Sequence, residues 1–256
     1  TFKLNKKQFN FIILMEPKKI AIENSDVWII DTDYSYDDTI SISYLAKHLN
    51  IIAITLCHRS PKIDLTTLQE KVKSDLKKIN KEKIEVFVGS TNPYVDYVKD
   101  LKDDEIMDPY SCDNNEDLSE FENLAIKNKK ISEEEKEKDA SDFISNIAAV
   151  KLIELINLHG KNLNILTLGP LTNLSLAVIL DVNIKDAFKN LFIMGGSIYN
   201  YGNSGTSAEY NFRCDPVAAK NVLGNYKNVR LLSLEIDHKL KDNHNELIKA
   251  IAELED

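Results

Sequence analysis

Four aspartates lie within eight positions, directly after a short apolar run. The run is Val27–Ile30, and the carboxylates belong to Asp31, Asp33, Asp37 and Asp38. Like charges about 4 Å apart repel by roughly 4 kcal/mol at an effective dielectric constant near 20, so such a cluster needs a compensating cation. Carboxylate oxygens at the end of a buried strand are ligands that calcium and magnesium prefer. The cluster therefore predicts a divalent-metal site and is the first candidate for chemistry.

Two other types of site share part of this pattern. The spacing of the carboxylates is like the start of an EF-hand loop, but that loop needs Gly at its sixth position and Glu at its twelfth, where this chain has Tyr36 and Ile42. An Asp-x-Asp after a strand also resembles the phosphatase motif of the haloacid dehalogenase family, although Ser35 stands where that family has Thr or Val. The EF-hand is excluded, and the phosphatase motif stays open at this point.

The segments around the cluster alternate between short apolar strands and helices. The expected strands are Val27–Ile30, Ile51–Thr55, Ile84–Val88, Leu163–Thr167, Asn190–Met194 and Val229–Leu234. The expected helices are Thr39–Leu49, Asp64–Ile79, Ala140–Leu158, Leu171–Leu180 and Pro216–Leu223. Strands that are apolar throughout are typical of an open, mostly parallel sheet with helices on both faces. The pattern predicts a doubly wound α/β domain whose sites lie at the carboxyl ends of the strands.

Composition and charge limit the class of protein. The 256 residues suit an N-terminal extension of residues 1–25 and one large domain over residues 26–256. The formal net charge of −9 at pH 7 argues against nucleic-acid binding, which generally needs a basic surface. No apolar run approaches the roughly 20 residues of a membrane span. Cys57, Cys112 and Cys214 are widely spaced, which predicts idle thiols in an intracellular, cytoplasmic protein, with an organellar location as the alternative.

Residues 94–139 interrupt the alternation of strands and helices. Between Asp103 and Glu122 there are nine acidic residues and no basic one. Such a charge run is typical of a solvated loop or surface helix. An insertion that binds a partner or acts as a lid is the alternative.

Three ordered blocks of the sequence resemble the inosine–uridine-preferring nucleoside hydrolases. The first is the Asp-Thr-Asp-x-x-x-Asp-Asp of residues 31–38, and the second, Thr-Leu-Gly-Pro-Leu-Thr-Asn over residues 167–173, looks like the Thr-Gly-Pro-Leu-Thr-Asn turn of that family. The third contains Met-Gly-Gly at 194–196, Gly-Asn at 202–203, Ala-Glu-Tyr-Asn at 208–211 and Asp-Pro at 215–216. Three blocks in the family's order are more specific than one Asp-x-Asp, so the chain is identified as a member of this family.

The resemblance implies a calcium-dependent hydrolase that cleaves the N-glycosidic bond of purine or pyrimidine nucleosides. In the family, calcium binds the ribose diol and the water that attacks C1′. Carried over, Asp33, Asp38 and the backbone carbonyl of Leu168 would be calcium ligands, and Asp31 would touch the metal or the ribose hydroxyls. Asp37 would be the general base that deprotonates the water. The residues that match the family's sugar-binding side chains are Met194, Asn203, Glu209 and Asn211.

Four features depart from the family's pattern. Its Pro-Gly pair is Tyr34-Ser35 here, and because glycine allows positive φ at little cost, Ser35 is expected to change the loop. After Ile54-Thr55 the family has Gly-Asn, whereas this chain has Leu-Cys-His-Arg-Ser over residues 56–60, where His58 is a candidate polar contact. The family's His-Gly segment is replaced by the acidic insertion. Its downstream His-Asp motif does not appear before Asp256, so the C-terminal part of the domain is expected to be absent.

Two functions therefore remain open. The first is an active ribohydrolase with a nucleoside substrate. It is favoured by the retained site residues Asp33, Asp37, Asp38, Asn203, Glu209 and Asn211. The second is a family member without catalysis that serves as a structural subunit of a larger assembly, favoured by the four departures. The family often forms homodimers or homotetramers, so an oligomer or a larger complex is expected in either case.

Overall fold

The computed structural model describes residues 26–58, 64–94, 147–199, 202–204 and 207–236. The N-terminal extension of residues 1–25 and nearly all of the acidic insertion lie outside these ranges. Cys57 and Cys214 are buried, and Cys112 lies outside the described residues.

The described strands form one parallel sheet. They are β1 (Val27–Thr32), β2 (Ile51–Leu56), β3 (Glu85–Val88), β4 (Leu163–Thr167), β5 (Asn190–Met194) and β6 (Val229–Leu232). Their order across the sheet is β3-β2-β1-β4-β5-β6, and each neighbouring pair is parallel. The direction of winding reverses between β1 and β4, and ligands of such folds bind beyond the carboxyl ends of the strands at this switch point. The predicted α/β sheet and its strands are confirmed.

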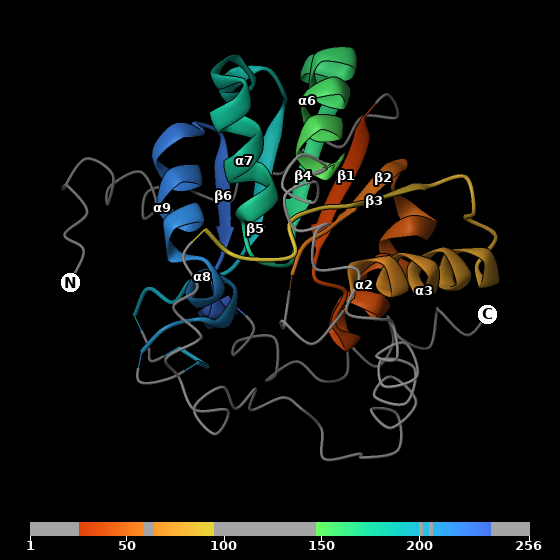
Figure 1. Ribbon diagram of the computed structural model, residues 1–256, viewed down its shortest axis with the longest axis horizontal. Coiled ribbons are helices and arrows are strands. Elements are labelled where there is room, and N and C mark those ends of the chain that lie inside the picture. The colour runs from red at the N-terminus through yellow and green to blue at the C-terminus, as the bar shows by residue number, and fades with distance from the viewer. Residues whose placement is uncertain (1–25, 59–63, 95–146, 200–201, 205–206, 237–256) are drawn as a thin grey trace, which may run out of the picture.

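Helices cover both faces of the sheet (Figure 1). They are α2 (Tyr36–His48), α3 (Leu65–Lys78), α6 (Ile147–His159), α7 (Thr172–Leu180), α8 (Tyr210–Cys214) and α9 (Pro216–Asn225). Two 3-10 turns, η4 (Gly160–Asn162) and η5 (Val182–Asp186), follow α6 and α7. The predicted helix Ala140–Leu158 corresponds to α6, and residues 140–146 lie outside the described part of the chain.

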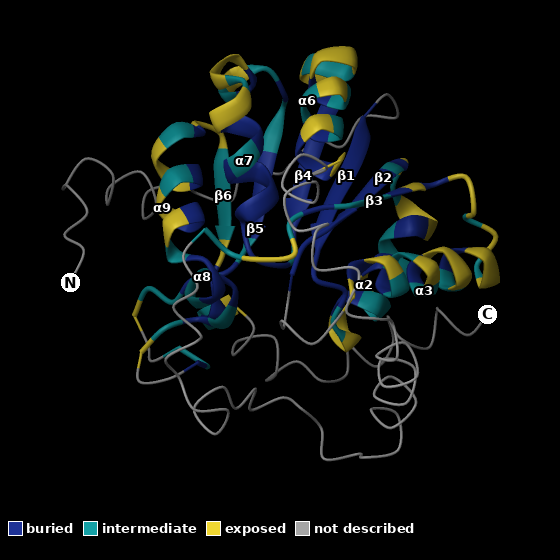
Figure 2. Ribbon diagram, in the orientation of Figure 1, coloured by how far each residue is buried: buried dark blue, intermediate teal, exposed yellow. Residues whose placement is uncertain are grey.

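The alternation of side chains along β1 supplies a separate core on each face. Val27 and Ile29 pack with α6, α7 and α9, whereas Trp28 and Ile30 pack with α2 and α3. Successive residues of a strand point to opposite faces, so a strand with helices on both sides is apolar at most of its positions. Figure 2 shows the consequence, because the central strands are buried along their length. Asp31 and Thr32 extend β1 past the predicted end as buried polar residues at the edge where a site can form.

Candidate active site

The carboxyl ends of three neighbouring strands meet at one junction. Asp31 lies near the end of β1, Leu168 follows β4, and Met194 ends β5. The N–H of Leu168 donates to the carbonyl of Asp31 at 2.7 Å, and the carbonyl of Leu168 accepts from Nδ2 of Asn211 at 2.8 Å. The same amide lies 3.3 Å from the carbonyl of Met194. Residues that the sequence assigns to the metal and to the sugar are therefore joined directly.

The first turn of α2 carries two of the four aspartates in different surroundings. Asp38 is buried, and its Oδ2 accepts from the hydroxyl of Thr32 at 2.6 Å and from the N–H of Ser35, the N-cap of α2, at 3.2 Å. Asp37 is exposed and accepts a hydrogen bond from the hydroxyl of Ser35. Carboxylates in a first helical turn are stabilised by the free backbone N–H groups there. The turn thus holds Asp38 inside and leaves Asp37 open to water.

The loop between the aspartates differs from the expectation for Ser35. Ser35 has an extended backbone, with φ −65° and ψ 175°, so it needs no glycine-like conformation. The left-handed residue is instead Tyr34, with φ 56°, which proline cannot adopt. The expected change of the loop therefore lies one residue earlier than Ser35, at Tyr34.

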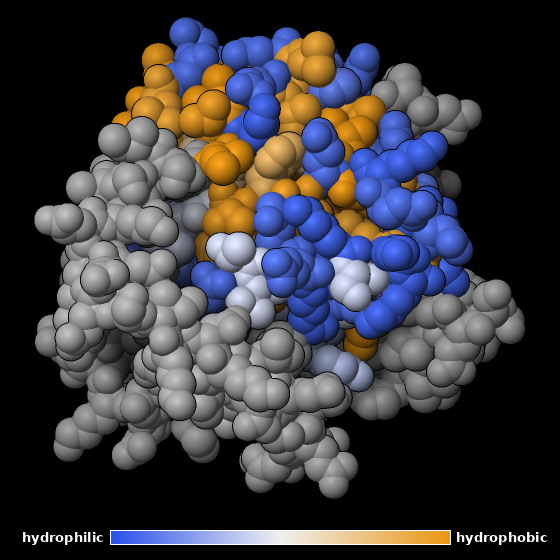
Figure 3. All heavy atoms as spheres, turned by 45° about the vertical axis from the view of Figure 1, so that its right-hand side comes forward, coloured by the Kyte–Doolittle hydropathy of each residue, from blue (hydrophilic) through white to orange (hydrophobic). Residues whose placement is uncertain are grey.

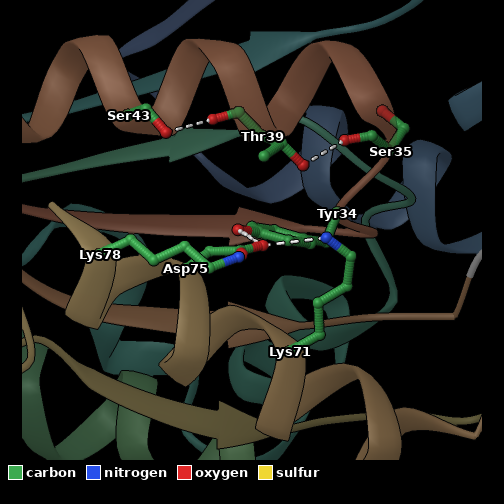
Figure 4. Close-up of polar contacts among 7 residues, drawn as sticks. All are labelled: Tyr34, Ser35, Thr39, Ser43, Lys71, Asp75 and Lys78. Carbon is green, nitrogen blue, oxygen red and sulfur yellow. Dashed lines mark hydrogen bonds and ion pairs between the residues drawn. The ribbon is translucent and has the colours of Figure 1, made fainter.

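Tyr34 is held in that conformation by contacts with α3 (Figure 4). Its side chain is buried, its hydroxyl donates to Asp75 at 3.2 Å, and the Lys71 ammonium lies 5.6 Å from its ring centre. Asp75 also binds Lys71 at 2.9 Å and Lys78 at 2.8 Å. Burial raises the pKa of Tyr34, and the charge of Asp75 raises it further. Tyr34 therefore anchors the loop that bears the aspartates to a second helix.

Asp31 is buried with one of its oxygens satisfied and the other not. Oδ1 accepts from the Thr55 hydroxyl at 2.5 Å and from Nδ2 of Asn173 at 2.8 Å. Oδ2 is buried and has no hydrogen-bond partner among the described residues. Burial raises the pKa of Asp31 to about 7, although the bonds from Asn173 and Thr55 oppose the shift, and the charge of Asp33 adds to it.

The remaining buried carboxyl groups repel one another. The pKa of Asp38 is raised well above its usual range by burial first, and then by the charge of Asp33 and a hydrogen bond with it, and by the charge of Asp37. Asp33 is itself buried, and a Cβ at Gly169 would lie 2.7 Å from its backbone nitrogen, so the loop after β4 approaches it closely. Among the described residues, no positively charged side chain contributes to the pKa shifts of Asp31 and Asp38. A bound cation would relieve this repulsion.

The donor atoms suit calcium in chemical kind. Carboxylate oxygens and a backbone carbonyl are the hard ligands that calcium prefers. Oδ2 of Asp31 is such an oxygen, buried and without a hydrogen-bond partner among the described residues. However, the described residues contain no group of three His, Cys, Asp or Glu side chains placed to hold a metal ion. The Leu168 carbonyl, a predicted ligand, accepts from Asn211. The site therefore offers suitable donors without three such side chains already gathered around one point.

The predicted sugar-binding residues lie on and around α8. Glu209 is the N-cap of this short helix: Oε1 accepts from the N–H of Asn211 at 2.9 Å, and Oε2 accepts from those of Gly196 at 2.8 Å and Phe212 at 3.1 Å. Burial raises the pKa of Glu209, and these backbone bonds oppose the shift. Asn203 accepts from the N–H of Tyr210 at 2.8 Å. A carboxylate has more acceptor sites than these bonds use, so capping and sugar binding are compatible.

Sequence reasoning assigned no role to the two polar residues that begin α7. Thr172 donates to Oδ2 of Asp215 at 2.7 Å, and its oxygen lies 3.0 Å from Nε2 of His58. Asn173 binds Asp31, as described above. Both residues stand in the Leu-Thr-Asn turn of the second sequence block, which was the available signal. The candidate polar contact at His58 is thereby linked through a hydroxyl to a buried carboxylate, Asp215.

Comparisons with known proteins identify the family. A family model described as Inosine-uridine preferring nucleoside hydrolase matches residues 28–256, so the chain belongs to that family. An uncharacterized protein of Schizosaccharomyces pombe is 27% identical over 214 residues, which cover 83% of this chain and 62% of that protein. Uridine nucleosidase 1 of Arabidopsis thaliana is 30% identical over 118 residues, which cover 46% of this chain and 33% of that protein.

A solved structure supports the fold. The plant nucleoside hydrolase PpNRh1 superimposes with a TM-score of 0.60 at 22% identity, over 84% of this chain and 61% of that chain, which at this identity shows the fold alone. The chain spans less than two thirds of the length of each of these relatives. Nothing in the comparisons supports the alternative of a structural subunit without catalysis. In the described part of the chain, no helix has the length and apolar character to cross a membrane.

Proposed function

We propose that this protein is a calcium-dependent ribonucleoside hydrolase that splits a nucleoside into ribose and base. The observation that carries the proposal is the junction at Leu168. Its N–H binds the carbonyl of Asp31, and its carbonyl binds the amide of Asn211, so the acidic residues and the candidate sugar-binding residues share one site at the switch point. Family membership gives the reaction class.

The roles that we propose for the individual residues follow the family's pattern. Calcium, when bound, would hold the ribose diol and lower the pKa of a water molecule. Asp33, Asp38 and the Leu168 carbonyl are the proposed ligands, with Asp31 beside them. Asp37, exposed on the first turn of α2, would accept the proton of the attacking water.

The side of the site around α8 would bind the sugar. Asn203, Glu209 and Asn211 can accept from or donate to sugar hydroxyls in fixed directions, and Met194 would pack beside the ring. Asn211 already contacts Met194, since its Nδ2 lies 3.4 Å from the sulfur. Nearby carboxylates would stabilise the positive charge that develops on the sugar in the transition state. We further propose that the protein works as an oligomer or as a subunit of a larger assembly.

The test is ribose release from inosine and from uridine by the full chain. Activity should appear with calcium chloride, disappear after treatment with EDTA and return when calcium is restored. Asp37→Asn should lower kcat by about 10² to 10⁴, because it removes the base. Glu154→Gln is the matched control, since this exposed carboxylate on α6 pairs with Lys151 and has no place in the site. A folded protein that releases no ribose from either substrate with calcium present would overturn the proposal.

A further inference from the structure

One buried amide in the first turn of α7 reaches three separate strand ends. Nδ2 of Asn173 donates to Oδ1 of Asp31 at 2.8 Å and to the carbonyl of Leu56 at 3.0 Å. Its Oδ1 accepts from the N–H of Ser90 at 2.9 Å. The side chain is 0% exposed. Asn173 therefore ties together the ends of β1 and β2 and the segment after β3 while using donors and acceptor alike.

The bonds to Asp31 fall on one side of its carboxylate. Thr55 on β2 donates to the same oxygen as Asn173, Oδ1, at 2.5 Å. Oδ2 is buried and receives no hydrogen bond from the described residues. A carboxylate held by two donors on one oxygen cannot rotate without losing both bonds, so its second oxygen has a fixed direction.

The space that the amide occupies depends on Gly89. A Cβ at this position would lie 2.2 Å from Oδ1 and 2.5 Å from Nδ2 of Asn173, and 2.4 Å from the carbonyl of Leu56. These distances are shorter than any van der Waals contact, and one of the atoms belongs to the backbone. The chain therefore allows Asn173 to reach Asp31 only with glycine at position 89.

We propose that Asn173 is a positioning residue of the nucleoside site. Together with Thr55 it holds Oδ1 of Asp31, so that Oδ2 keeps one direction, in which it would bind calcium or a ribose hydroxyl. Asn173 itself acts through Asp31 and touches neither the metal nor the sugar. This inference rests on the proposed function, because calcium binding is the property that the geometry of Asp31 would serve.

The first measurement is the calcium affinity of the metal-free full chain by titration calorimetry. Asn173→Ala and Thr55→Val should each weaken calcium binding about 10- to 100-fold, the effect usual for an outer hydrogen-bond partner of a metal ligand. Thr55→Ser keeps the hydroxyl and should bind calcium like the wild type. Asn221→Ala is the control for Asn173→Ala, since it removes an amide bond of 2.8 Å from α9 to Ser175 on α7 without touching Asp31.

A double-mutant cycle separates a positioning role from a merely structural one. If Asn173 acts through Asp31, then Asn173→Ala should not weaken calcium binding further in the background of Asp31→Ala. A loss of melting temperature in Asn173→Ala does not affect this comparison, because affinity is measured on folded protein. Should Asn173→Ala fail to fold, Thr55→Val decides on its own, since valine keeps the shape of threonine.

The outcomes distinguish this inference from the proposed function. If the wild type binds calcium and releases ribose while Asn173→Ala and Thr55→Val bind calcium equally well, the positioning role is overturned and the proposed function stands. Full additivity of Asn173→Ala and Asp31→Ala also overturns it. If the wild type neither binds calcium nor releases ribose, the proposed function is overturned and the inference falls with it.

Discussion

The burial of Asp31 lowers the stability of the folded protein at neutral pH, and it also leaves a buried carboxylate oxygen that a cation could bind. Its carboxyl is fully buried, and its pKa is raised from 3.8 to about 7, mainly by burial. A carboxyl that resists ionisation in the folded state favours folding when it is protonated in both states. That contribution is complete below pH 3.8 and is lost as the pH rises through about 7. Ionised Asp31 therefore lowers the free energy of unfolding at neutral pH, and a bound cation would remove this loss.

We therefore expect metal-free wild type to lose stability between pH 4 and 8 relative to Asp31→Asn, which cannot ionise. The relative loss should reach about 4 kcal/mol at pH 8, at about 1.4 kcal/mol for each pKa unit. Urea unfolding in EDTA at several pH values, with both proteins side by side, measures it. If the two stability curves stay parallel over this range, Asp31 is not the titrating group.

Tyr34 connects the aspartate loop with α3 through one hydroxyl. Tyr34→Phe should lower the free energy of unfolding by about 1 kcal/mol, since it removes the 3.2 Å bond to Asp75 and leaves the buried ring in place. Denaturant unfolding measures the change. The matched control is Tyr44→Phe on α2, whose ring keeps its contact with His48 and whose stability should change by less than about 0.5 kcal/mol. An equal loss in both variants would show that the Asp75 bond has no special weight.

At the scale of elements, the sequence predicted strands more accurately than the short helices. β4 and β5 begin and end at the predicted residues, because a strand covered on both faces is mostly apolar and stands out in the sequence. α2 begins at Tyr36, three residues before the predicted start, because Ser35 and the aspartates cap it. α8 was missed, since five residues are too few to show a helical period.

The side-chain contacts between elements could not be predicted from the sequence for a different reason. Asn173 and Asp31 are separated by 142 positions, and their bond depends on the crossing of a helix turn and a strand end. The three sequence blocks gave the residues of the candidate site, but the partners that orient these residues could not be predicted from them. The positive φ of Tyr34 is a further case, because tyrosine carries no local signal for it.

Two glycines test whether a close approach of elements is required. Gly89→Ala should destabilise the protein by about 3 kcal/mol or more, because its Cβ would overlap Asn173 and the carbonyl of Leu56. Gly224→Ala, on α9, meets no atom within 4 Å and should stabilise the protein by about 0.5 kcal/mol through its higher helix propensity. Thermal unfolding of both variants gives the comparison. Tolerance of alanine at position 89 would mean that the turn of α7 can move away from β2.

At the scale of the whole molecule, the site draws on both sides of the switch point. The carboxylates come from β1, α2 and the loop between them, whereas the Leu168 carbonyl and the proposed sugar-binding residues Met194 and Asn211 come from the ends of β4 and β5 and from α8. Both sides share the two cores, since Ile29 of β1 packs in the core with α6, α7 and α9, and Phe192 of β5 packs in the core with α2 and α3. Other apolar side chains are exposed on α6 and α7, among them Leu158 and Leu180. In Figure 3, apolar residues are visible over the upper part of the surface.

A ligand that bridges the two sides should stabilise the molecule as a whole. We expect calcium at about 100 times its dissociation constant to raise the free energy of unfolding by about 2.7 kcal/mol, because it binds the folded state alone. The gain should appear in one cooperative thermal transition and should vanish with EDTA. Asp38→Asn should abolish it from the β1 side. Asn211→Ala should reduce it from the α8 side, since it releases the Leu168 carbonyl from the 2.8 Å bond that fixes its direction. If calcium still stabilises Asp38→Asn, the ion binds elsewhere. If calcium stabilises Asn211→Ala as much as the wild type, the metal is held by β1 and α2 without help from the other half of the sheet.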